Sequence, residues 1–292
     1  MSNLPKLAVT GATGEVGGRV ARRISHAGVE QRLVVRQAAD APVLPGAVAV
    51  EASDYGDFED MARALRGAST LFLVSGRESR HRLEQHVTAI DAAIRAGVEC
   101  IVYLSFLGAS PDATFTLARQ HHATEQHIRE CGVRFTFLRS SMYADFVPFL
   151  SGPDGVIKGP AGKGKVSWIS RDDIADTVVA VMQDRSYDGE TLDNTGPAAL
   201  NLEETAAVLS RVTGRDIGYV DETVEEAWES RRLSGAPDWE IAGWVSSYLA
   251  IAAGEMETVS DTVERLTGRP AGDLEPFLIE NPELWSHLVP GD

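Results

Sequence analysis

The sequence contains few cysteines and few basic residues, and each scarcity excludes a class of protein. Only two of the 292 residues are cysteines, Cys100 and Cys131, and they show no metal-ligand spacing. This usage is typical of a reducing compartment and not of a disulfide-bonded secreted domain. Lys and Arg number 27 against 43 for Asp and Glu, which gives a formal net charge of −16. Such acidity argues against nucleic acid or an anionic membrane as a partner.

A long hydrophobic run is also missing. The longest apolar stretch covers 241–253 and is interrupted by Gly243, Ser246 and Ser247. It is too short to cross a bilayer and is predicted to be a packed helix. Residues 1–6 lack the charged and then apolar pattern of a secretory signal peptide. We therefore expect a cytoplasmic protein without a membrane partner, and we leave open whether it is a monomer or a homodimer.

The chain does contain a regular alternation of short apolar runs and longer amphipathic segments. Gly97 and Gly132 follow two of the helical patterns, where a C-terminal cap favours a left-handed residue. The predicted strands in the first 140 residues are 7–10, 33–35, 48–50, 70–74, 101–104 and 135–138. Strands that alternate with helices predict right-handed βαβ units and a doubly wound parallel sheet, which is an α/β Rossmann fold.

The length accommodates two domains of about 150 residues. We expect a dinucleotide-binding Rossmann domain over 1–152 and a smaller, mostly helical substrate or lid region over 153–292. Parts of 185–215 are expected to return to the Rossmann sheet. Trp228 and Trp244 lie in the helical region and are expected to be core or lid residues.

A glycine-rich loop directly after the first predicted strand is the most informative motif. Gly11, Gly14 and Gly17 form G-x-x-G-x-x-G between a strand and a helix. Glycines allow the backbone to turn tightly and to approach a pyrophosphate, whose charge then lies at the helix N-terminus. The loop therefore predicts a dinucleotide site, and the alternative is a tight turn without a ligand.

The residue after the second predicted strand distinguishes the two nicotinamide dinucleotides. NAD-binding units place a carboxylate there, about 20 positions after the glycines, to bind the ribose hydroxyls. This sequence has Arg36 instead, with no carboxylate adjacent. A guanidinium pairs with the 2′-phosphate of NADP, so we expect NADP(H) in preference to NAD(H). The alternative is that Arg36 is a solvated loop residue.

These motifs and several later ones resemble the NmrA-like group of atypical short-chain dehydrogenases. The matching segments are 9–17 (VTGATGEVG), 53–57 (SDYGD), 96–105 (AGVECIVYLS), 131–139 (CGVRFTFLR), 159–165 (GPAGKGK), 169–175 (ISRDDIA) and 187–197 (YDGETLDNTGP). Within this group the layout is most similar to the NADPH-dependent quinone oxidoreductases.

The resemblance implies a set of cofactor-binding residues. The glycine loop would hold the pyrophosphate, Arg36 the adenosine phosphate, and Asp54 would flank the adenine. Residues 73–75, at the carboxyl end of the fourth strand, would lie along the nicotinamide. The implied cofactor-binding residues are Gly11, Thr13, Gly14, Glu15, Val16, Arg36, Asp54, Leu73, Val74, Ser75 and His121.

The sequence departs from the ordinary short-chain dehydrogenases at the catalytic pair. Those enzymes use Tyr-x-x-x-Lys, whose tyrosine protonates the carbonyl oxygen while the lysine lowers its pKa. The corresponding positions hold Leu117 and His121, and leucine donates no proton. The catalytic candidates that remain are His121, Ser105 and Tyr143. The simpler alternatives are a ribose contact for His121, a strand-end cap for Ser105 and packing at the domain junction for Tyr143.

Three histidines lie on one predicted helix without forming a metal motif. His121, His122 and His127 do not share one helical face and do not have the H-E-x-x-H spacing, so no metal site is expected. In the loop after the sixth strand, Met142 and Phe146 are expected to form an apolar wall for a ligand.

The leading functional hypothesis is an NADPH-dependent oxidoreductase for a quinone-like or aromatic carbonyl compound. A quinone suits the missing tyrosine, because an acceptor that forms a phenolate needs less help from a general acid. One alternative is a catalytically silent redox sensor that binds NADP and signals to a protein partner. Another is a non-reductive tailoring enzyme of aromatic metabolite biosynthesis on the same scaffold.

Overall fold

The computed structural model describes residues 4–289, which form two compact units. The first unit comprises the residues up to 109 together with 120–139 and 174–193. The second comprises 110–119, 140–173 and the residues from 194 onward. The sheet of the first unit takes its last strand from beyond residue 190, within the 185–215 segment. In the described range, no helix is long and apolar enough to cross a membrane.

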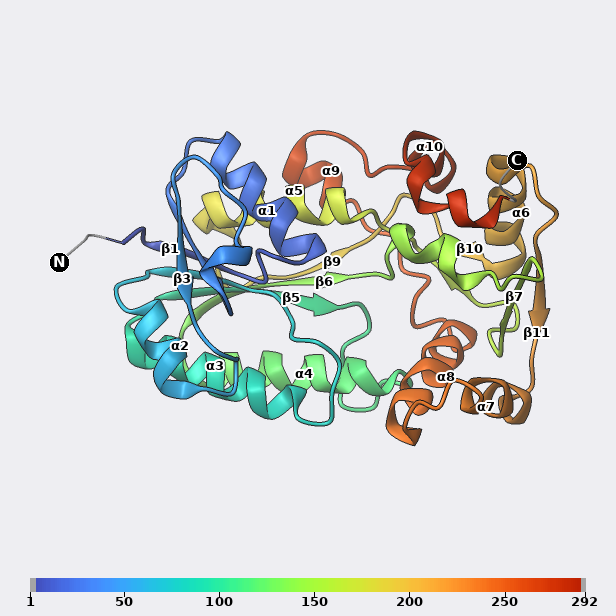
Figure 1. Ribbon diagram of the computed structural model, residues 1–292, viewed down its shortest axis with the longest axis horizontal. Helices are drawn as coiled ribbons and strands as arrows, with labels where there is room; N and C mark the ends of the chain where they lie inside the picture. The colour runs from blue at the N-terminus through green and yellow to red at the C-terminus, as the bar shows by residue number, and fades with distance from the viewer. Residues whose placement is uncertain (1–3, 290–292) are drawn as a thin grey trace. The chain divides into compact units, whose positions relative to one another are not determined.

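Seven strands of the described chain form one sheet in the order β3-β2-β1-β4-β5-β6-β9 (Figure 1). They are β1 Leu7–Thr10, β2 Gln31–Val35, β3 Ala47–Glu51, β4 Thr70–Leu73, β5 Cys100–Phe106, β6 Arg134–Ser140 and β9 Thr191–Asn194. β1 pairs in parallel with β2 on one side and with β4 on the other. This order confirms the predicted doubly wound fold, and the carboxyl ends of β1 and β4 flank the switch point at which such sheets bind ligands.

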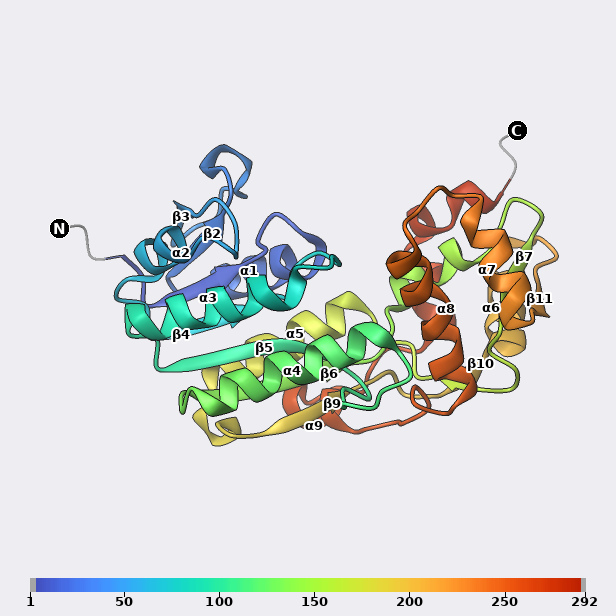
Figure 2. The same cartoon turned by 90° about the horizontal axis from the view of Figure 1, so that it is seen from below.

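Helices cover both faces of this sheet (Figures 1 and 2). α1 Glu15–His26 and α5 Arg171–Gln183 lie on one face, and α2 Phe58–Leu65, α3 Arg82–Ala96 and α4 Thr116–Glu130 lie on the other. A strand covered on both faces is apolar along its whole length, and Leu71, Phe72 and Leu73 of β4 are fully buried. The layers therefore leave the strand ends and their loops as the places where polar side chains can gather.

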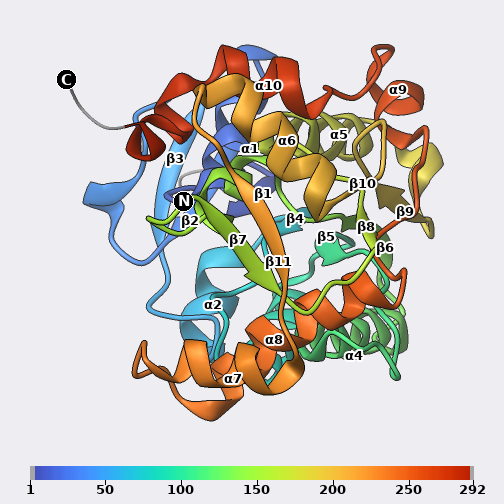
Figure 3. The same cartoon turned by 90° about the vertical axis from the view of Figure 1, so that its right-hand side faces the viewer.

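The second unit contains two small sheets and most of the later helices (Figure 3). β7 Val156–Gly159 pairs in parallel with β11 Gly218–Asp221, and β8 Lys165–Val166 pairs antiparallel with β10 Leu200–Asn201. Its helices are η2 Ala144–Leu150, α6 Leu202–Thr213, α7 Val224–Arg232, α8 Asp238–Ala252, α9 Thr262–Thr267 and α10 Leu274–Glu280. Trp228 and Trp244 pack against a small core between α7 and α8.

Candidate cofactor site

The loop between β1 and α1 has the geometry that its glycine spacing predicts. Gly11 has a left-handed φ of 64°, and its carbonyl accepts a hydrogen bond from the Gly14 amide at 2.9 Å. Gly14 is the N-cap of α1, and no side chain among the described residues caps the helix there. Thr13 and Glu15 are exposed beside it, with Val16 buried behind them. The first amides of a helix lack intrahelical acceptors, so this uncapped end offers donors to an anion.

Gly17 lets α1 pack directly on the backbone of the loop. A Cβ at Gly17 would lie 2.3 Å from the Gly11 carbonyl oxygen and 2.8 Å from that of Thr10. A Cβ at Gly14 would approach the Gly11 oxygen only to 3.3 Å. The close packing at Gly17 holds the helix N-terminus at the end of β1. The residues present therefore fit a dinucleotide pyrophosphate held by backbone amides.

The two arginines at β2 have different environments. Arg32 is fully buried and donates hydrogen bonds to three backbone carbonyl oxygens. Arg36 follows the strand, is exposed, and has no hydrogen-bond or ion-pair partner among the described residues. Asp54, also exposed, accepts hydrogen bonds from the Gly56 amide at 2.8 Å and from Gln85 Nε2 at 2.9 Å. Arg36 is therefore available to a phosphate, whereas Asp54 shapes the turn after β3.

The loop after β4 lies against the glycine loop. Leu73 is the buried last residue of β4, and Val74 and Ser75 follow it, half-buried. A Cβ at Gly11 would lie 3.1 Å from the Val74 Cβ. The Thr10 hydroxyl links the two strand ends, because it accepts a hydrogen bond from the Val74 amide at 3.0 Å. The structure thus brings the predicted pyrophosphate and nicotinamide segments together.

Two further side chains that the sequence reasoning missed, one half-buried and one buried, fix this loop. The Tyr55 hydroxyl donates to the Val74 carbonyl at 2.9 Å. The Gly76 amide donates to His86 Nε2 at 2.8 Å, and His86 Nδ1 lies 2.9 Å from the Thr124 hydroxyl. Burial raises the pKa of Tyr55, while burial and the Arg82 charge lower the pKa of His86 to about 3, so both side chains are neutral.

A signal for both residues was present in the sequence. Tyr55 is the centre of the 53–57 motif that carries part of the family resemblance. His86 lies on the same face of α3 as the buried residues Ala89, Ile90 and Ala93. A polar residue at helical spacing on an apolar face indicates a buried hydrogen-bonded group.

His121 is part of a buried hydrogen-bonded cluster. Its Nε2 accepts a hydrogen bond from Arg82 at 2.8 Å, and its Nδ1 lies 2.9 Å from the Tyr103 hydroxyl. Since arginine only donates, the hydrogen of the neutral ring is on Nδ1 and points to Tyr103. Burial, together with the charge of Arg82 and the nearby His86, lowers the pKa of His121 well below its usual value. A proton-transfer or ribose-binding role for His121 would require this cluster to open.

Ser105 belongs to a second buried cluster. Its hydroxyl donates to Glu125 Oε1 at 2.6 Å, and Glu125 is fully buried. Arg139 binds both carboxylate oxygens of Glu125, through Nε at 2.9 Å and Nη2 at 2.7 Å. Arg129 lies 3.4 Å from the same carboxylate. This ion pair ties β5, α4 and β6 together, and it directs the Ser105 hydroxyl away from a catalytic role in this conformation.

Tyr143 and Leu117 belong to the second unit. Tyr143 precedes η2, and the Arg171 guanidinium carbon lies 5.2 Å from its ring centroid. Leu117 is 5% exposed, and a Cβ at Gly243 of α8 would lie 3.8 Å from it. Leu117, which we expect at the position of the usual catalytic tyrosine, is therefore a packed aliphatic side chain.

Exposed aromatic rings gather on η2 in the same unit. Phe146 and Phe149 are 52% and 54% exposed, and their rings are nearly parallel with centroids 6.0 Å apart. Phe149 also stacks on His287 at 4.7 Å, whereas Met142 is half-buried. Flat, exposed rings of this kind provide a stacking surface for a planar ligand.

Comparison with known proteins places these features in a family. Residues 11–185 match the NAD(P)H-binding family. The chain is 31% identical to the NAD(P)H azoreductase of Xenophilus azovorans, covering 92% of this chain and 95% of that protein. It is 30% identical to quinone oxidoreductase 2 of Escherichia coli, covering 92% of this chain and 96% of that protein.

Solved structures agree with this placement. The NADPH complex of the NADPH-dependent quinone oxidoreductase from Escherichia coli superposes with a TM-score of 0.86 at 29% identity, covering 94% of this chain and 99% of that one. Nmra, a negative transcriptional regulator, has a TM-score of 0.76 at 16% identity over 98% of this chain and 99% of that one, and so shares the fold. The chain therefore belongs to the NAD(P)H-binding family and is related to the quinone oxidoreductases.

Proposed function

We propose that this protein is an NADPH-dependent oxidoreductase that reduces quinone-like or aromatic compounds. The proposal rests on a helix N-terminus after β1 and on Arg36 after β2, the strand that pairs with β1. Within residues 4–289 no side chain caps that helix and none binds Arg36. An anion-binding helix end and a guanidinium on adjacent strands match the pyrophosphate and the 2′-phosphate of NADPH. The names of the azoreductase and quinone oxidoreductase relatives suggest the class of substrate.

The residues of this chain would mainly bind the cofactor and fix its position. The amides of the glycine loop would hold the pyrophosphate, and Arg36 would pair with the 2′-phosphate. NADPH, when bound, supplies the hydride. Thr10, Tyr55 and His86 hold the loop after β4, so the surface offered to the nicotinamide is fixed before the cofactor arrives. Preorganisation of this kind reduces the entropy lost on binding.

The substrate class follows from the missing proton donor. Leu117 has no proton to give, and the neutral His121 ring is bonded at both nitrogens. An acceptor that becomes a stabilised phenolate needs little general-acid help, which favours a quinone over a simple ketone.

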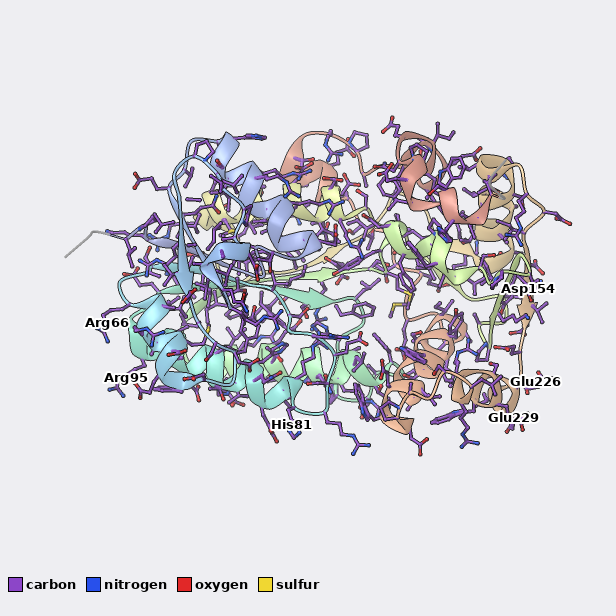
Figure 4. The ribbon with its side chains drawn as sticks, in the orientation of Figure 1. Arg66, His81, Arg95, Asp154, Glu226 and Glu229 are labelled. Carbon is purple, nitrogen blue, oxygen red and sulfur yellow. The ribbon has the colours of Figure 1, made fainter. Side chains whose placement is uncertain are left out.

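The cofactor part is tested by titrating NADPH and NADH into the wild type and into two arginine variants. Arg36→Ala removes a charged hydrogen bond and should raise the Kd for NADPH about 10- to 100-fold, with little effect on NADH. Arg95→Ala is the matched control, because Arg95 is an exposed residue at the C-terminal end of α3 and is labelled at the rim of the molecule in Figure 4. Equal affinity of the wild type for NADH and NADPH would refute this assignment.

The catalytic part is tested by following NADPH oxidation with a benzoquinone, a naphthoquinone, an azo dye and an aromatic ketone. We expect turnover with the quinones and little or none with the aromatic ketone. Tight NADPH binding without turnover of any acceptor would reject the reductase. That outcome would instead favour the NADP-binding sensor, with which Leu117 is equally compatible.

A further inference from the structure

Three side chains with different donor atoms converge on the surface formed by α3 and α4. Asp91 comes from α3, His127 from α4, and Cys131 directly follows α4. Asp91 Oδ1 lies 2.7 Å from His127 Nε2, and Cys131 Sγ lies 3.8 Å from the same nitrogen. One ligand atom from each residue lies within 4.8 Å of the other two.

These separations are close to those in a tetrahedral zinc site. Bonds of about 2.0–2.3 Å from zinc to nitrogen, oxygen and sulfur place neighbouring ligand atoms roughly 3.3–3.6 Å apart. His127 and Cys131 are four residues apart, so they share one side of the helix and reach the same point. Asp91 has a side chain that is 47% exposed, and it can move by the fraction of an ångström that a metal would require.

The local charge and accessibility also suit a cation. The carboxylates of Asp91 and Glu130 both lie near Cys131, so the charge around the cluster is negative. The His127 side chain is 25% exposed, so an ion can reach the cluster from solvent. Three protein ligands leave a fourth position of the tetrahedron to water.

The absence of a metal motif along one helix does not bear on this cluster. The expectation of no metal site rested on His121, His122 and His127, which do not share a helical face. The cluster uses only His127 of these three, and it takes a ligand from α3 that lies 36 positions earlier. Only the fold brings a carboxylate to this side of α4.

We propose that Asp91, His127 and Cys131 form a binding site for one Zn²⁺ ion. The site is separate from the residues proposed to hold NADPH, and it does not depend on the proposed function. An ion held there would connect α3, which carries His86, to α4, which carries His121. Because it would bind the folded chain, it should raise the melting temperature.

The test uses the full chain without an affinity tag, stripped of metal and kept reduced by a phosphine. Zn²⁺ is titrated against a chromophoric chelator, and Co²⁺ is used as a spectroscopic probe of thiolate ligation. We expect one ion per chain at micromolar free metal, a cobalt–thiolate charge-transfer band, and a higher melting temperature. His127→Gln and Cys131→Ser should each weaken Zn²⁺ binding at least 10-fold, and Cys131→Ser should abolish the band.

Matched controls separate this site from the other metal-binding side chains. His81→Gln changes an exposed histidine that pairs with Glu84, and Cys100→Ser changes the other cysteine, which is buried. Neither should alter the stoichiometry or the band. NADPH titration verifies that each variant is folded. Metal binding that persists in both His127→Gln and Cys131→Ser, or no binding at micromolar Zn²⁺, would overturn the proposal.

Discussion

Replacing Gly17 by alanine is expected to displace the glycine loop and weaken dinucleotide binding. The new Cβ would lie 2.3 Å from the Gly11 carbonyl oxygen, whereas ordinary contacts begin near 3.4 Å. The obstacle is backbone, which no side-chain rotation can remove. The loop and the start of α1 must therefore separate by about 1 Å.

The expected change in stability is the cost of overpacking minus the gain in helix propensity, and the change in affinity follows from the displaced loop. Overpacking costs about 1–3 kcal/mol, and alanine in a helix recovers about 1 kcal/mol relative to glycine. The free energy of unfolding should therefore fall by up to about 2 kcal/mol. A shift of about 1 Å also lengthens a hydrogen bond from a loop amide to a phosphate beyond its useful range. Loss of one such bond corresponds to a Kd for NADPH about 10- to 100-fold higher.

Gly18→Ala provides a neighbouring control in the same helix. Its Cβ would lie 3.0 Å from the Ala12 carbonyl oxygen, so the two atoms need to separate by only a few tenths of an ångström. Urea denaturation measures the stability of both variants, and fluorescence titration measures their affinity for NADPH. If Gly17→Ala matched Gly18→Ala in both measurements, the close packing of α1 on the loop would not limit cofactor binding.

Three further predictions concern buried groups. Burial keeps the pKa of His86 at about 3 while an unfolded histidine has about 6.5, so only the unfolded state gains this proton as the pH falls. Lowering the pH from about 7.5 to about 5 should cost about 2 kcal/mol of stability by urea denaturation, and His86→Gln should lose less over this range. Tyr55→Phe removes the hydroxyl that donates to the Val74 carbonyl. It should lower the free energy of unfolding by about 1–3 kcal/mol and weaken NADPH binding. An unchanged melting temperature would contradict the role of this hydrogen bond. Glu125→Gln leaves Arg139 unpaired and should cost about 3 kcal/mol, measured by thermal unfolding against Ser105→Ala, which should cost less.

The fold was predictable because its signals are local and repeated. Apolar runs separated by amphipathic segments predict six strands of the Rossmann sheet with errors of a residue or two, and β9 was expected only as part of 185–215. α1 begins at Glu15, so Gly17 and Gly18 lie inside the helix. Low helix propensity is overridden here by the packing that these glycines permit.

The partners inside the candidate site were not predictable from spacing. Arg82 and His121 are 39 positions apart, and Ser105 and Arg139 meet only through Glu125. The residue types indicate that these side chains can take part in acid–base chemistry. Only the fold shows that their polar atoms form hydrogen bonds and ion pairs with one another. The tertiary neighbours of a buried polar group decide whether it reacts or stabilises.

The interleaving of the two units limits how this protein can be divided. The chain crosses from one unit to the other five times, after residues 109, 119, 139, 173 and 193. A fragment that ended at residue 152 would lack β9 and α5, and β6 would become an open edge that invites self-association. Replacing either unit by that of a relative would require several simultaneous crossovers in the gene. Sequence variation in the second unit is therefore expected to arise by substitution and loop insertion.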